Sequence, residues 1–263
     1  MIDINVELRR LALLLHTSVE ELDYLKSIGP EGVQTLRLKF QDSLIDDFEP
    51  ALSKLASTAS MTPTSVSEKI CVKYLGPTLT SYLSYYTPIK MATKLAQRFA
   101  PDFMIEVASE QIPERAKALL EDFPVDLMRP VTRGLVGRED WATMGGFVDY
   151  LPAEKSLALM AEVPDPVANL RIASFAQNKE LIARMVTQFD DATLTALVVA
   201  AADGDDVMKR EVCIVADHLP ESSLEQLLRV SESIPAAQQK ALEDYAAANG
   251  FNRLVEIYHQ SAG

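Results

Sequence analysis

The strongest constraint on the fold is a ten-residue pattern that the chain repeats four times. The copies read QIPERAKALL (111–120), YLPAEKSLAL (150–159), QFDDATLTAL (188–197) and HLPESSLEQL (218–227). Each copy has a polar residue, then an apolar residue, then Pro or Asp, with an acidic residue close behind. A leucine follows eight residues after the apolar one.

Every position of this pattern suits the first turns of an α-helix. Proline is tolerated in the first turn because the amide that it lacks has no intrahelical partner there. Acidic side chains in the first turn complement the helix dipole. The leucine then falls two turns later, where it points towards a core. These leucines are Leu120, Leu159, Leu197 and Leu227, and the apolar residues before them are Ile112, Leu151, Phe189 and Leu219.

The spacing between copies leaves room for one or two further helices. Counted between the apolar positions, the spacings are 39, 38 and 30 residues, and we expect additional helices at 125–135, 139–149 and 166–175. Helical units that recur at such periods are typical of an α-solenoid. The alternative is that a common helix start recurs by chance. The recurring leucine favours true repetition, and the shorter third spacing argues against it.

The stretches LPAEKSLALM, IPERAKALL and LPESSLEQLL resemble the helical repeats in the cytoplasmic N-terminal domain of MgtE-type magnesium transporters, and HEAT-like repeats in general. The resemblance covers about residues 107–230. It implies short helices stacked into a right-handed superhelix. The chain has no counterpart of the regulatory domains or membrane segments of those transporters, so the resemblance implies no transport role.

The first ninety residues predict a series of helices. Gly29-Pro30 ends one helix, and a stripe of apolar residues over 32–58 predicts another with a break near Glu49-Pro50. The polar stretch STASMTPTS (57–65) is expected to be a linker. The segment 77–88 is the one β-like run, but a helix is favoured because no second strand is available to pair with it.

The predicted fold is therefore all-α, with an N-terminal helical region followed by an α-solenoid-like array of short stacked helices. We expect two domains, an N-terminal helical region at 1–90 and a helical-repeat domain at 91–263.

The net charge of −13 argues against nucleic-acid binding, which needs basic side chains opposite the phosphates. The charge is uneven along the chain. Residues 1–90 hold nine Lys or Arg and eleven Asp or Glu, whereas 91–263 hold sixteen and twenty-seven. Solubility through self-repulsion explains such an excess. A basic protein partner or a divalent cation is the alternative.

Several features indicate a cytoplasmic protein without membrane insertion. The N-terminus lacks the basic start and apolar core of a signal peptide, and the longest apolar runs are far too short to span a membrane. Cys71 and Cys213 lie far apart in apolar surroundings, which predicts buried free thiols rather than a disulfide or a zinc site.

No catalytic residues and no cofactor are predicted, since the sequence holds no nucleophile motif and no phosphate-binding glycine loop. The three histidines, His16, His218 and His259, lack metal-ligand spacing. One candidate metal site remains, formed by Asp203, Asp205 and Asp206, whose carboxylates could hold Mg²⁺ or Ca²⁺. The competing interpretation is that Asp205 or Asp206 caps the next helix.

The aromatic residues are interpreted as core. Trp141, Met144, Phe147 and Tyr150 form a helical stripe, and Tyr82, Tyr85 and Tyr86 fit the edge of a core or an interface.

We therefore expect a non-catalytic helical-repeat protein that binds another protein, and the acidic charge favours a basic partner. One alternative is a helical protein that binds a small apolar ligand between its helices, lined by methionines and Tyr82–Tyr86. Another is a regulatory domain that responds to a divalent cation through the three aspartates. Homo-oligomerisation is left open.

Overall fold

In the computed structural model, which describes residues 3–255, the chain is all-α, as predicted, and the described residues form no strand. The chain divides into two compact units, residues 1–162 and 163–263. The predicted boundary near residue 90 falls inside the first unit, within the helix Ile89–Ala96, and the division into domains at that point stays a prediction.

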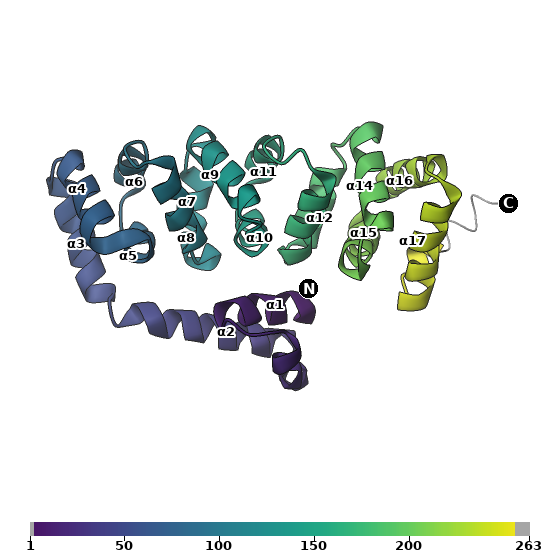
Figure 1. Ribbon diagram of the computed structural model, residues 1–263, viewed down its shortest axis with the longest axis horizontal. Coiled ribbons are helices and arrows are strands. Elements are labelled where there is room, and N and C mark those ends of the chain that lie inside the picture. The colour runs from purple at the N-terminus through teal and green to yellow at the C-terminus, as the bar shows by residue number, and fades with distance from the viewer. Residues whose placement is uncertain (1–2, 256–263) are drawn as a thin grey trace. The chain divides into compact units, whose positions relative to one another are not determined.

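The described residues of the first unit form eleven α-helices, one 3₁₀ helix and one π-helical turn, and the α-helices are labelled in Figure 1. They are α1 (Ile4–Leu14), the 3₁₀ helix η1 (Glu20–Ile28), α2 (Gly29–Asp46), α3 (Glu49–Met61), α4 (Thr64–Ile70), the π-helical turn η2 (Cys71–Leu75), α5 (Gly76–Ser84), α6 (Ile89–Ala96), α7 (Pro101–Ser109), α8 (Pro113–Asp122), α9 (Val125–Gly137), α10 (Trp141–Val148) and α11 (Ala153–Met160).

The second unit continues with helices of similar length. They are α12 (Pro166–Phe175), α13 (Lys179–Val186), α14 (Asp191–Asp203), α15 (Asp206–His218), α16 (Glu221–Ser233) and α17 (Ala236–Asn249).

Helix starts are written clearly into the sequence. Proline occupies the N-cap or one of the first two positions of most helices, where its missing amide costs no hydrogen bond. In the second unit, a polar side chain caps the N-terminus of each helix from α12 to α15. Asp165, Asn178, Asp190 and Asp205 each accept a hydrogen bond from a backbone N–H in the first turn of the helix that follows.

Helices in both units pack against the helix after next in the chain. In the first unit α3 contacts α5, α5 contacts α7, α7 contacts α9 and α9 contacts α11, while α4 contacts α6 and α8 contacts α10. In the second unit α12 contacts α14 and α14 contacts α16, while α13 contacts α15 and α15 contacts α17. In the first unit the odd-numbered helices α3 to α11 therefore form one row, beside which α4 pairs with α6 and α8 with α10. In the second unit alternate helices form two rows.

The four repeated stretches form the starts of α8, α11, α14 and α16, and the three additional helices expected between them are α9, α10 and α12. Ile112, Leu151 and Leu219 are buried, as an anchor before the helix requires. The recurring leucine is buried in three copies. In the third copy Leu197 is half-buried, and Leu194 and Val198 are buried instead, so the buried stripe of α14 is rotated.

Gly146 allows two helices to approach closely. A Cβ atom built at Gly146 in α10 would lie 2.6 Å from Cγ of Pro113 at the start of α8. Real Cβ contacts are not this short, so the contact between α10 and α8 requires a glycine here.

The N-terminal expectations are confirmed in part. Residues 77–88 are helical over most of their length in α5, and the break expected near Glu49-Pro50 lies between α2 and α3. The prediction of a linker at 57–65 is wrong, because α3 extends to Met61 and only Thr62 and Pro63 connect it to α4. The helix before Gly29 is a 3₁₀ helix, and Gly29 has a φ of 74°.

No helix among the described residues combines the length and the apolar character needed to cross a membrane.

Candidate functional site

Two of the three predicted cation ligands are engaged by protein partners. Asp205 caps α15 through Met208 N–H at 3.1 Å, and its second carboxylate oxygen lies 2.8 Å from Nη1 of Arg171. Burial raises the pKa of Asp205, but the Met208 N–H and the Arg171 guanidinium outweigh it and lower that pKa. Asp203 accepts two hydrogen bonds from Nε2 of Gln238. Asp206 is exposed in the first turn of α15.

The capping role of Asp205 is thus confirmed. Within residues 3–255, no group of three His, Cys, Asp or Glu side chains is arranged to hold a metal ion. The cation site itself stays a prediction.

The tyrosine cluster at the end of α5, formed by Tyr82, Tyr85 and Tyr86, packs at the edge of the core, as interpreted from the sequence. Tyr85 accepts a hydrogen bond from Ile112 N–H at 2.8 Å, and burial raises the pKa of Tyr85 to about 12. Ser81 donates to the carbonyl of Glu110 at 3.0 Å, and Gln111 donates to Ser84 Oγ at the same distance. The cluster therefore holds the segment that leads into α8.

A shallow cleft of about 270 Å³ lies beside this cluster in the first unit. It is lined by Leu13, Leu14 and His16 at the end of α1, by Gln41 and Tyr82, and by residues 109–112. A pocket for a small ligand is mostly larger and mainly apolar. Of the residues predicted to line a cavity for an apolar ligand, Tyr82 lines this cleft and none of the methionines does, and that cavity stays a prediction.

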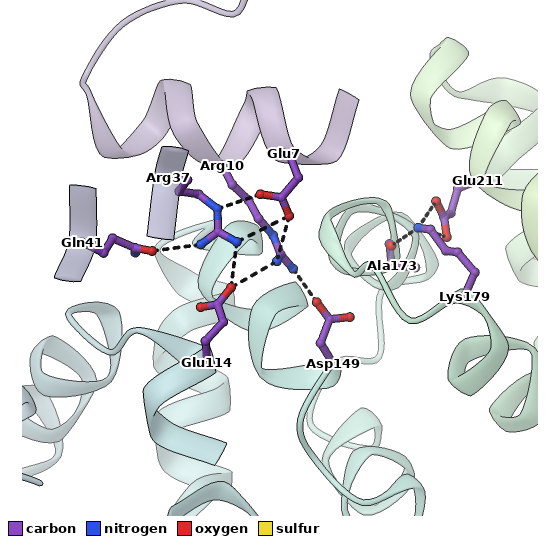
Figure 2. A network of polar contacts seen from close by, with 9 residues as sticks. All are labelled: Glu7, Arg10, Arg37, Gln41, Glu114, Asp149, Ala173, Lys179 and Glu211. Atoms are coloured by element: carbon purple, nitrogen blue, oxygen red, sulfur yellow. Dashed lines mark hydrogen bonds and ion pairs between the residues drawn. The ribbon is translucent and has the colours of Figure 1, made fainter. Parts of the chain in front are cut away.

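The most distinctive polar feature of the first unit is a buried network of charged side chains (Figure 2). Nε of Arg37 in α2 donates to Glu7 of α1 at 2.8 Å, and Nη2 of Arg37 donates to Glu114 of α8 at 2.7 Å. Arg10 of α1 lies 2.6 Å from Asp149 at the end of α10. The Glu7 side chain is 0% exposed and that of Arg37 is 4% exposed. The network joins α1 and α2 to α8 and α10.

The charges in this network reinforce one another. Burial alone lowers the pKa of Arg37, but Glu114 and Glu7 outweigh it. The pKa of Arg37 is therefore raised, and its guanidinium stays protonated. Burial alone raises the pKa of Glu114, but Arg37 and Arg10 outweigh it and hold that pKa below its usual value. Such a network fixes the orientation of the elements that it joins, because any other arrangement would leave a charge unpaired.

The second unit has a smaller buried pair of its own. Nζ of Lys179, at the start of α13, lies 2.8 and 2.7 Å from the two carboxylate oxygens of Glu211 in α15. It also donates to the carbonyl of Ala173 near the end of α12 at 2.7 Å (Figure 2). One ammonium therefore joins α12, α13 and α15.

Large apolar side chains are exposed mainly in the N-terminal part of the chain. Among the side chains that the structure describes, all of the exposed large hydrophobic residues except Val167 lie between residues 13 and 74. They are Leu13, Leu15, Tyr24, Ile28, Leu36, Phe40, Phe48, Leu55, Met61, Val66, Ile70, Val72 and Tyr74. Exposed apolar side chains are therefore concentrated in one part of the chain, and such side chains mark interaction sites where they gather into a patch.

The cysteines and histidines have structural or solvent-exposed positions. Cys71 and Cys213 are buried free thiols, as predicted. Burial, and then the nearby Asp217, raise the pKa of Cys213 to about 12, so its thiol stays protonated and unreactive. His16 follows the end of α1, and His218 is exposed with Nδ1 2.8 Å from the carbonyl of Ile214. His259 lies outside the described residues.

Comparison with known protein families, curated proteins and solved structures finds no match to this chain.

The buried charges were not predicted from the sequence. A signal for one of them was present, because Glu7 lies between Val6 and Leu8 on the side of α1 that Leu11 also occupies. A charged residue inside an apolar stripe indicates a buried and paired charge. No comparable local signal marks Arg37 or Glu114 as its partners.

Proposed function

We propose that the protein is a non-catalytic α-solenoid scaffold that binds other proteins. The observation that carries this proposal is the concentration of exposed large apolar side chains between residues 13 and 74. Isolated apolar residues are common on protein surfaces, but such a concentration over consecutive helices is typical of a surface that another chain covers.

The packing of the helices supports the same proposal. From α3 onward most helices contact the next but one within their unit, which is the arrangement expected for stacked helical repeats. Arrays of this kind present long surfaces to other chains. The acidic surface of residues 91–263 suits a basic partner, through complementary charge that speeds encounter and excludes wrong partners.

The buried polar groups fit a structural role rather than catalysis. The buried charges of Arg37, Glu7 and Glu114 pair with one another. The Tyr85 hydroxyl accepts a hydrogen bond from Ile112 N–H. A catalytic acid or base needs access to a substrate, and these side chains are buried among protein partners.

The test is photo-crosslinking in living cells from single positions of the full chain. A photoreactive residue at Phe40 or Ile70, both exposed and apolar, should capture the same protein repeatedly, in reciprocal experiments and at a fixed ratio. The matched control is Glu225, an exposed acidic position on α16. If the apolar positions capture no more than Glu225 does, while the purified chain converts a metabolite, the scaffold proposal is wrong.

A further inference from the structure

We propose that the outer flank of α4 and η2 is a docking site for an acidic amphipathic helix of a partner protein. This inference rests on the proposed scaffold function and names the site and the chemistry of one partner. The surface, called the α4 flank below, consists of Val66, Ile70, Tyr74, Lys69 and Lys73.

The apolar part of the α4 flank is a row of three side chains. Val66, Ile70 and Tyr74 follow one another at intervals of four residues, so they lie one above another on one side of the helix. Their exposed fractions are 44%, 39% and 80%. A row with this spacing is the surface that a second helix packs against.

The α4 flank faces away from the neighbours that the helix already has. Cys71 is buried in the core with Leu52 and Ala56 of α3, so the inner side of α4 and η2 is the one that faces α3. Glu68 pairs with Arg98, which follows α6, at 2.6 Å. Glu68 lies two residues from both Val66 and Ile70, so α6 is on the opposite side of α4 from the apolar row.

The position of α4 explains why exposed apolar side chains are unusual on it. Among the alternate helices that contact one another, α4 comes first and contacts α6. In stacked repeats the first helix needs a polar outer side to remain soluble, because no earlier repeat covers it. Here the outer side carries Val66, Ile70 and Tyr74, which is the pattern of a side that another helix covers.

Charge identifies the occupant. Lys69 and Lys73, also four residues apart, form a second row beside the apolar one, and both are exposed. Neither ammonium makes a hydrogen bond or an ion pair within the described part of the chain. Residues 51–90 contain Glu68 as their one acidic residue, and it is engaged by Arg98. A partner helix with carboxylates beside its apolar stripe therefore complements this surface.

Two other occupants fit less well. A second copy of the chain meeting the same surface would bring its own Lys69 and Lys73 into the contact, and like charges there oppose association. An anionic membrane would repel a chain whose net charge is −13. A single helix on the α4 flank interacts mainly with Lys69 and Lys73. The acidic groups elsewhere on the chain act on it weakly, because salt screens interactions beyond about 8 Å at physiological ionic strength.

The experiment is a selection of single helices from a displayed library against the full chain. The library fixes an apolar stripe and draws the flanking positions equally from Glu, Gln and Lys. We expect enrichment of Glu over Lys. Binding of the selected helices should weaken about tenfold with the double substitution K69E/K73E, and a new selection against that variant should enrich Lys instead.

The matched control is K90E/K94E, which reverses two exposed lysines at the same spacing on α6. It should change the affinity by less than about twofold, because these lysines lie away from the apolar row. Both double variants should keep the wild-type unfolding midpoint, since all four side chains are exposed.

Four results would overturn the inference. One is enrichment without a preference for Glu, and a second is equal loss of binding in both double variants. A third is self-association of the chain that Ile70→Asp abolishes, which would identify a second copy as the occupant. The fourth is binding to phosphatidylglycerol vesicles that K69E/K73E removes while no helix is selected. If one of these results is obtained while the chain still crosslinks its cellular partner from Phe40, the scaffold function stands and the α4 flank alone is wrong.

Discussion

Nη2 of Arg37 lies 2.7 Å from a carboxylate oxygen of Glu114, a residue 77 positions further along the chain. The same guanidinium pairs with Glu7 at 2.8 Å. One side chain therefore joins α1 and α2 to the start of α8, whose own first residue packs against Gly146 of α10. Buried ion pairs therefore link the N-terminal helices α1 and α2 to α8 and α10.

Arg37→Met should destabilise the protein by about 3 to 5 kcal/mol, because it leaves the buried carboxylates of Glu7 and Glu114 without their main partner. Urea unfolding at neutral pH measures the change. Arg98→Met is the control, since the Arg98–Glu68 pair is exposed and its loss should cost less than about 1 kcal/mol. Equal effects of the two substitutions would show that the Arg37 network is not buried in solution.

Stability should fall in acid partly through Glu114. The pKa of Glu114 is lower in the folded protein than in the unfolded chain, so its contribution to stability is complete above the unfolded value of about 4.3 and is lost as the pH falls through the folded value. The free energy of unfolding is measured from about pH 6 to pH 3 for the wild type and for Glu114→Gln. The difference between the two should shrink as the pH falls, and a constant difference would contradict the account.

Lys179 and Glu211 should behave as a coupled pair. Lys179→Met alone, or Glu211→Leu alone, leaves a buried charge unpaired and should cost about 3 to 5 kcal/mol. The double variant should be considerably more stable than the sum of the two losses predicts, because it leaves no charge behind. A double-mutant cycle from urea unfolding measures this coupling, and additive losses would contradict the pairing.

Gly146→Ala should destabilise the protein by about 1 to 3 kcal/mol, because the new Cβ would meet the ring of Pro113. The matched control is Gly137→Ala at the end of α9, where a Cβ meets nothing within 4 Å. Alanine is the better helix former, so that variant should be neutral or slightly more stable. Thermal unfolding of both variants distinguishes a packing effect from a general effect of glycine replacement.

Helix starts were predictable because their chemistry is local. A proline or an aspartate within the first turn acts on amides a few residues away, so α8, α11, α14 and α16 could be placed from the sequence. Local chemistry also explains the failure at 57–65. Ser57 and Thr58 donate hydrogen bonds to the carbonyl of Lys54 one turn earlier, so these polar side chains are satisfied within α3 and the helix continues.

Long-range partners could not be predicted in the same way. Lys179 and Glu211 are 32 residues apart, and no period of the sequence relates them. Their pairing follows from the contact of α13 with α15, which exists only once the helices have stacked. The candidate docking surface was missed for a related reason, since Val66, Ile70 and Tyr74 resemble an ordinary core stripe until the structure shows that nothing covers them.

The central claim is that the protein works by holding another protein. The most direct test is the size and composition of the complex that contains the full chain, recovered from its own cells at its natural level. The account predicts an assembly larger than the 29.0 kDa chain, with a second protein at a fixed ratio. Recovery of the chain alone, together with conversion of a small molecule by the purified protein, would contradict it.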